Sequence, residues 1–210
     1  MKLRYIVTAI ILSLLFGCSN KVCNCPVDQE IQYTNDSIIN SWNNQDWWSE
    51  IGIETISQFE YDFYRLTIFP SWNNSTVTQY ILENKKGNTL MSIKEYQQDQ
   101  STEKLTLKKK GGTKNLHMDS DKWTEINTLA ESNCFWNMPV ATGEQYLDGV
   151  SWLLEVKKRD VNICSKKQYH IVSRVARDSS FFSICNDILK LGNSSIKEQD
   201  SLLDISWRTD

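Results

Sequence analysis

Five polar side chains of types that enzymes use for catalysis lie close together in the chain: Asp148, Glu155, Tyr169, His170 and Arg174. A carboxylate and a histidine can share general acid–base work when both reach the same substrate. Strand-like alternation around these residues places Glu155 and Tyr169 on one side of an expected hairpin. It places His170 and Arg174 on the other side. This separation argues against an acid–base pair.

Most of these residues also have a structural interpretation. Asp148 and Gly149 are typical of a turn that leads into a strand. Trp152, which follows, is predicted to be a core residue. Arg174 is predicted to form an ion pair with a carboxylate such as Glu155 or Asp148, because guanidinium groups bind carboxylates in a bidentate manner.

Two functional interpretations stay open for the same stretch. In the first, it binds a ligand through the side chains Trp152, Glu155, Tyr169 and Arg174. In the second, the protein is a hydrolase that uses Glu155, His170 or Asp148. The sequence contains no nucleophile elbow, phosphate-binding loop or dinucleotide-binding fingerprint. It therefore predicts no catalytic residues and favours binding over catalysis.

The sequence predicts no metal site and no cofactor. It has two histidines, His117 and His170, too few for a His-rich metal site. Zinc held by cysteines alone needs four ligands, and the well-separated cysteines of the chain's second half supply three: Cys134, Cys164 and Cys185.

The cysteine count leaves the disulfide pattern open. Five cysteines follow Cys18, and this odd number means that at least one cannot pair within the chain. A disulfide among Cys134, Cys164 and Cys185 is one prediction. Buried free thiols are the other, because cysteine packs as a small hydrophobic residue. The remaining two cysteines, Cys23 and Cys25, are assigned to a flexible tether.

A β-hairpin between two amphipathic helices must position the candidate residues. Residues 150–157 and 169–175 alternate apolar and polar side chains, as the strands of a hairpin do. Residues 123–134 repeat apolar side chains at three- and four-residue spacing, which predicts a helix that includes Cys134. A second helix is predicted from the cap at Asp178 to Gly192.

Four earlier segments also alternate with a period of two: residues 62–70, 76–83, 89–96 and 104–110. Short polar turns separate them, so they predict an antiparallel meander. The expected fold class is α+β, with one antiparallel sheet, built from the four-stranded meander and the β-hairpin, packed on one face by two helices.

The series of motifs from about residue 59 to residue 192 resembles a widespread group of small uncharacterised bacterial proteins. The resemblance is carried by YRLTIFP, CFWNMP, the Asp-Gly-x-x-Trp-x-x-Glu motif that begins at Asp148, and the Tyr-His-x-Val-x-Arg motif that begins at Tyr169. The chain departs from the group after Arg174, where Val-Ala-Arg replaces Trp-Ser-Pro. The resemblance implies a common fold and assigns no catalytic residue.

The first 18 residues resemble the leader of a bacterial lipoprotein. Two basic residues precede an apolar run that ends in Leu-Phe-Gly-Cys, similar to the lipobox, and Cys18 is the expected acylation site. A cleaved soluble secretion signal or an uncleaved anchor is the alternative. Several acyl chains would make the anchoring effectively permanent. No aspartate follows Cys18 directly, which favours the outer membrane, facing the periplasm.

The length suits a single domain. The predicted boundaries are a signal peptide at 1–17, a lipid anchor and flexible tether at 18–44, one α+β domain at 45–192 and a polar tail at 193–210. Three tryptophans lie where the tether meets the domain and are either a stacking platform or buried indoles: Trp42, Trp47 and Trp48.

The net charge of −3 and the pI of about 5.5 argue against a general nucleic-acid binder. The local exception, Lys108 to Lys110, is predicted to be a solvated hairpin tip. The sequence thus predicts a membrane-anchored lipoprotein of the cell envelope that binds another envelope protein or a small polar ligand. The alternative is the envelope hydrolase.

Overall fold

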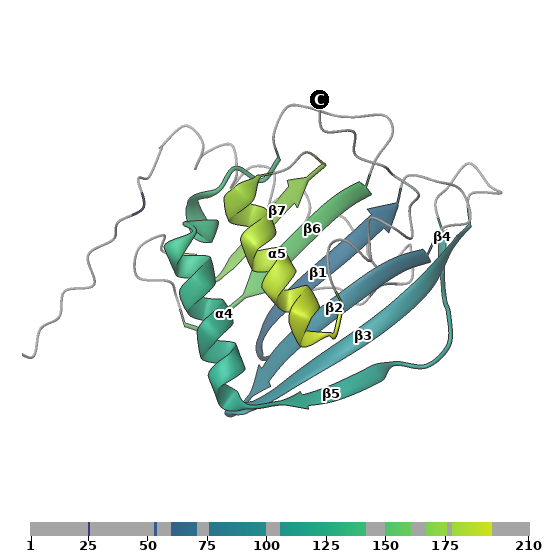
Figure 1. Ribbon diagram of the computed structural model, residues 1–210, viewed down its shortest axis with the longest axis horizontal. Coiled ribbons are helices and arrows are strands. Elements are labelled where there is room, and N and C mark those ends of the chain that lie inside the picture. Colours follow the sequence, from purple (N-terminus) through teal and green to yellow (C-terminus); the bar gives the residue numbers. More distant parts are fainter. Residues whose placement is uncertain are drawn as a thin grey trace, which may run out of the picture.

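In the computed structural model, the described part of the chain folds as one antiparallel sheet of seven strands with two α-helices against one face (Figure 1). This confirms the predicted α+β class. The described residues are Cys25, Ile53, 60–70, 76–99, 106–141, 150–160, 167–175 and 178–194. Within these ranges, no helix is both long enough and apolar enough to cross a membrane.

The predicted meander is confirmed. Strands β1 (Asp62–Pro70), β2 (Thr76–Lys85), β3 (Asn88–Asp99) and β4 (Thr106–Lys109) pair in sequence order, each antiparallel to the one before. The turn between β2 and β3 ends at Gly87, whose φ of 88° is a conformation that favours glycine.

The sequence did not predict strand β5 (Lys114–Met118). Strand β3 is long enough to take two partners on one edge: its first half pairs with β5 and its last residues pair with β4. Three of the five side chains of β5 are exposed and the other two are only partly buried. A strand with so little burial does not alternate strongly between apolar and polar side chains. The search for such alternation in the sequence therefore did not find β5.

The predicted hairpin is also confirmed, as β6 (Val150–Lys157) and β7 (Tyr169–Arg174). Strand β6 pairs with β1 on the edge opposite to β2, so the strand order is β4-β3-β2-β1-β6-β7. Strand β1 therefore joins the meander to the hairpin, and its side chains alternate between two buried faces.

The two faces of the sheet are buried differently. Side chains of β1 that face the helices, Tyr64, Leu66 and Ile68, belong to the main apolar core. Those on the opposite face, Phe63, Arg65 and Thr67, are also fully buried. A smaller apolar cluster forms on this second face and includes Ile53, Leu153 and Ile171. The sequence predicted a covered face only beneath the helices. The structure also buries polar side chains on the opposite face of the sheet.

The two predicted helices are present as α4 (Ser120–Ser132) and α5 (Ser179–Leu191). Asp178 caps α5 as expected, because its carboxylate accepts hydrogen bonds from the backbone N–H groups of Ser180 and Phe181. The prediction that Cys134 lies within the first helix is wrong. Cys134 has a left-handed backbone, with φ 56°, and precedes the 3₁₀ turn η2 (Phe135–Asn137).

Gly192, at the end of α5, lies against the aromatic ring of Tyr80, and an added Cβ would come within 2.7 Å of a ring carbon. Gly192→Ala should lower the free energy of unfolding by about 1–3 kcal/mol, because the buried ring must move. Gly112→Ala is the matched control, since nothing lies within 4 Å of its Cβ position. Urea denaturation of both variants measures the difference, and equal stability would contradict the close approach.

Candidate functional site

A buried ion pair between Arg65 and Glu155 lies at the centre of the second face of the sheet. The two residues are direct cross-strand partners on β1 and β6. Arg65 donates from Nε to Oε2 at 2.6 Å and from Nη2 to Oε1 at 2.9 Å, and both side chains are 0% exposed. The prediction that Glu155 pairs with Arg174 is therefore wrong, because Arg174 lies on the opposite face.

Tyr169 gives the Glu155 carboxylate a third hydrogen bond. Its hydroxyl donates to Oε1 at 3.1 Å, which confirms that Glu155 and Tyr169 share a face. Burial, together with the negative charge of Glu155, raises the pKa of Tyr169 well above its ordinary value. The phenol thus stays protonated and remains a donor. Glu155 accepts three hydrogen bonds inside the fold, which makes it a poor general base.

Other polar groups on this face also bond to one another. Gln79 donates to the hydroxyl of Thr67 at 3.1 Å, and both side chains are buried. Tyr61, just before β1, donates to Glu83 near the end of β2 at 3.1 Å. Buried polar groups need such partners, because an unpaired one costs free energy. These contacts explain how polar strand residues are accommodated in the interior.

His170 lies on the helix-facing side of β7 and is fully buried. Its Nε2 is 2.9 Å from the backbone oxygen of Met138. Since a carbonyl oxygen only accepts, Nε2 carries the proton and donates it, which leaves Nδ1 as the unprotonated nitrogen. Among the described residues, Nδ1 has no hydrogen-bond partner. Burial, with the positive charge of Lys167, lowers the pKa of His170 to about 3.

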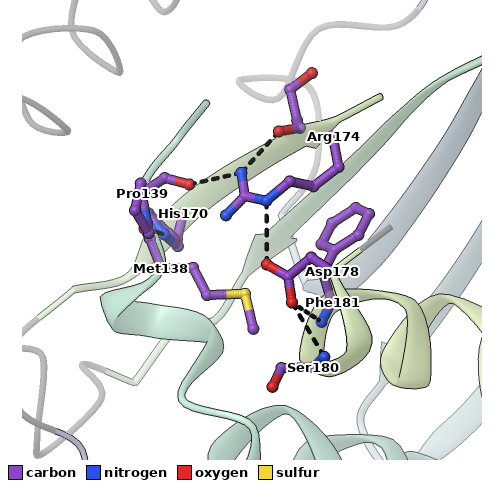
Figure 2. A network of polar contacts seen from close by, with 8 residues as sticks. Met138, Pro139, His170, Arg174, Asp178, Ser180 and Phe181 are labelled. Atoms are coloured by element: carbon purple, nitrogen blue, oxygen red, sulfur yellow. Dashed lines mark hydrogen bonds and ion pairs between the residues drawn. The ribbon is translucent and has the colours of Figure 1, made fainter. Parts of the chain in front are cut away.

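Arg174 binds Asp178 and the backbone (Figure 2). Its Nε donates to Asp178 Oδ2 at 3.2 Å, and its Nη1 donates to the carbonyl oxygens of Pro139 at 3.0 Å and Ser173 at 2.7 Å. The ion pair predicted for Arg174 exists among the described residues, where its partner is Asp178 and not Glu155; Asp148 lies outside the described part of the chain. Asp178 thus caps α5 with one oxygen and binds Arg174 with the other.

Together these contacts attach residues 138–141 to β7. The carbonyl of Met138 accepts from His170, that of Pro139 from Arg174, and that of Val140 from the backbone N–H of Ser173 at 2.7 Å. The segment ends in a parallel bridge from Ala141 to Ser173. Since an unpaired strand edge can pair with other chains, this segment protects β7. His170 and Arg174 therefore have clear structural roles.

The four predicted ligand-binding residues are not brought to one surface. Trp152 is 2% exposed and packs edge-to-face on Phe182 at 5.2 Å, in agreement with its predicted place in the core. It is the cross-strand partner of Arg174 on the helix side, whereas Glu155 and Tyr169 lie on the second face. Other residues singled out from the sequence lie outside the described part of the chain: Cys18, Cys23, Trp42, Trp47, Trp48, Asp148 and Cys164.

The structure pairs Cys134 with Cys25, 109 residues earlier in the sequence. This corrects the prediction of a disulfide among Cys134, Cys164 and Cys185, and it removes Cys25 from the flexible tether. Asn137 also donates to the backbone oxygen of Cys25 at 3.4 Å.

Cys185 is a free thiol, fully buried in the core, and burial raises its pKa well above the ordinary value. The described residues contain no group of three or more potential metal ligands.

Removal of one partner of the Arg65–Glu155 pair should destabilise the fold strongly. Glu155→Gln leaves a buried guanidinium without its counter-charge, and the free energy of unfolding should fall by about 3–5 kcal/mol. The double variant Arg65→Met/Glu155→Leu should recover most of this loss, because no buried charge remains. Urea denaturation tests both. A Glu155→Gln protein as stable as the wild type would show that the pair is not structural.

His170 should make stability depend on pH. The unfolded chain binds a proton near pH 6.5, whereas folded His170 stays neutral down to about pH 3. The free energy of unfolding should therefore fall as the pH drops below about 6.5, by about 2 kcal/mol between pH 7 and pH 5 from this residue. His170→Gln, which keeps a donor for Met138, should lose that contribution. Denaturant titrations of the wild type and of His170→Gln at pH 7 and pH 5 measure the free energy of unfolding of each. If it falls equally in both proteins, His170 is not the source of the pH dependence.

Comparisons of the chain with protein-family models, with curated proteins and with solved structures found no match.

Proposed function

We propose that this chain is a membrane-anchored lipoprotein of the bacterial cell envelope, and that its α+β domain binds another envelope protein or a small polar ligand. The leader at residues 1–17 supplies export, and Cys18 supplies the attachment point for lipid. The outer membrane, on its periplasmic side, is the proposed location, because no aspartate follows Cys18.

The observation that carries the proposal is the disulfide between Cys25 and Cys134. Stable disulfides form in oxidising compartments such as the bacterial periplasm, and the reducing cytosol rarely keeps them. A disulfide that involves a residue seven positions after a lipobox-like cysteine therefore agrees with export of the domain to such a compartment. The leader and the disulfide are independent features of the chain, and both favour the cell envelope.

Binding is favoured over catalysis by where the polar side chains lie. The hydrolase alternative needs a carboxylate and a histidine that reach one substrate. Glu155 and His170 are both 0% exposed and lie on opposite faces of the sheet. Each is also held by contacts that support the fold. No described contact favours the hydrolase, so binding remains the function that we propose.

Lipidation at Cys18 can be tested by growing cells that express the protein with an alkyne-bearing fatty acid. We expect the wild-type protein to take up the label and to sediment with membranes, and Cys18→Ala to do neither. Cys23→Ala is the matched control, because it removes a nearby cysteine outside the lipobox-like motif and should still be labelled. An unlabelled, soluble wild-type protein would contradict anchoring and support a secreted form.

The binding role can be tested by chemical crosslinking in intact envelopes, followed by purification of the wild-type protein and of Cys18→Ala. A defined crosslinked protein that is lost in the Cys18→Ala sample would support an anchored interaction module. A small-ligand role predicts instead a rise in melting temperature of the purified domain with one class of envelope metabolite. Absence of both effects would contradict the binding proposal.

A further inference from the structure

We propose that the Cys25–Cys134 disulfide determines which side of the domain faces the lipid bilayer. The end formed by the last turn of α4 and by η2 faces the membrane, and the β4–β5 edge points away from it. This inference rests on the lipid anchor at Cys18 proposed above. Its physical basis is the short length of chain between the anchor and the disulfide.

Cys25 comes only seven residues after Cys18 in the sequence. A fully extended chain spans at most about 3.3–3.6 Å per residue, so this connection reaches about 25 Å. The next described residue that packs in the domain is Ile53, 35 residues after the anchor, and a connection of that length has a reach of roughly 120 Å. The disulfide therefore replaces a long connection by one shorter than the diameter of a domain of this size, about 40 Å.

The attachment point is rigid. Cys134 lies between α4 and η2, and the next two side chains, Phe135 and Trp136, are 0% and 4% exposed. The hydrogen bond from Asn137 to the backbone oxygen of Cys25 gives a second contact at the same place. The covalent bond and the buried residues beside it fix Cys25 to one position on the domain surface.

This position lies near the β6–β7 edge of the sheet. Glu131, in the last turn of α4, is 3.8 Å from the ammonium of Lys158, which follows β6. The same ammonium lies over the ring of Trp136, at 5.5 Å from its centroid. Strands β4 and β7 are the two ends of the strand order, five spacings of about 4.8 Å apart, which is roughly 24 Å. Figure 1 shows α4 and β4 on opposite sides of the domain.

Charge attraction does not account for this orientation. Two basic side chains at this end, Lys158 and Arg159, have acidic neighbours within 4 Å, namely Glu131 and Asp62. This pairing reduces the net charge that the two side chains present to a bilayer, and salt screens what remains. The length of the connection therefore sets the orientation. The outward side then carries β5 and the exposed lysines at the end of β4, Lys108, Lys109 and Lys110, which places them towards other envelope components.

The test measures energy transfer from a fluorescent amino acid in the lipidated protein to rhodamine-labelled lipid in phosphatidylcholine vesicles. One protein carries the fluorophore at Ser132, at the end of α4, and another carries it at Lys109, at the end of β4. Both positions are exposed. We expect markedly stronger transfer from position 132 than from position 109.

A flexible Gly-Ser insert of about 20 residues after Asn20 should remove most of this difference, because such a linker adds roughly 25 Å of reach and leaves the disulfide intact. The double variant Cys25→Ser/Cys134→Ser should have the same effect, provided that circular dichroism shows a folded domain. Flotation with the vesicles is measured on every sample. Failure of the wild type to float would overturn the anchor and with it this inference. Flotation with equal transfer from both positions would overturn the orientation alone.

Discussion

The register in which β1 pairs with β6, and so joins the two parts of the sheet, is specified by the buried ion pair between Arg65 and Glu155. Strand β1 belongs to the meander and β6 belongs to the hairpin. These two strands pair with each other, and Arg65 and Glu155 are direct cross-strand partners. A buried ion pair gains little net stability, because desolvation cancels most of its attraction. Its main effect is on register. A slip by one residue would turn Arg65 into the apolar core beneath the helices and leave both charges unpaired.

This register also determines on which face the candidate residues of β6 and β7 lie. With Glu155 on the second face, the pairing of β6 with β7 puts Tyr169 beside it. The alternate residues of β7, His170 and Arg174, then face the helices, where they bind residues 138–141 and Asp178. One cross-strand pair thus assigns structural partners to side chains that sequence reasoning treated as candidates for recognition or catalysis.

The sequence predicted the features that depend on local pattern. Alternation located six of the strands, and it put Glu155 and Tyr169 on one face. The features that depend on distant pairing were missed. Arg65 becomes the partner of Glu155 only when β1 pairs with β6, and Cys25 is 109 residues from Cys134. The Arg174–Asp178 pair is local, because the two residues are four positions apart. The sequence predicted only the capping role of Asp178, whereas its carboxylate both caps α5 and binds Arg174.

The disulfide and the network around β7 are neighbours in the chain, and this has a mechanical consequence under the proposed anchoring. A pulling force on the proposed lipid anchor would act on the domain through the disulfide at Cys134. Residues 138–141 follow Cys134 closely in the sequence and would bear this force next. Three backbone carbonyls of this segment accept hydrogen bonds from β7. Strand β7 pairs with β6, and β6 carries Glu155, which binds Arg65 at the centre of the sheet. The proposed anchor would therefore act on an edge of the sheet that side-chain hydrogen bonds reinforce, and the weakly buried strand β5 lies outside that path.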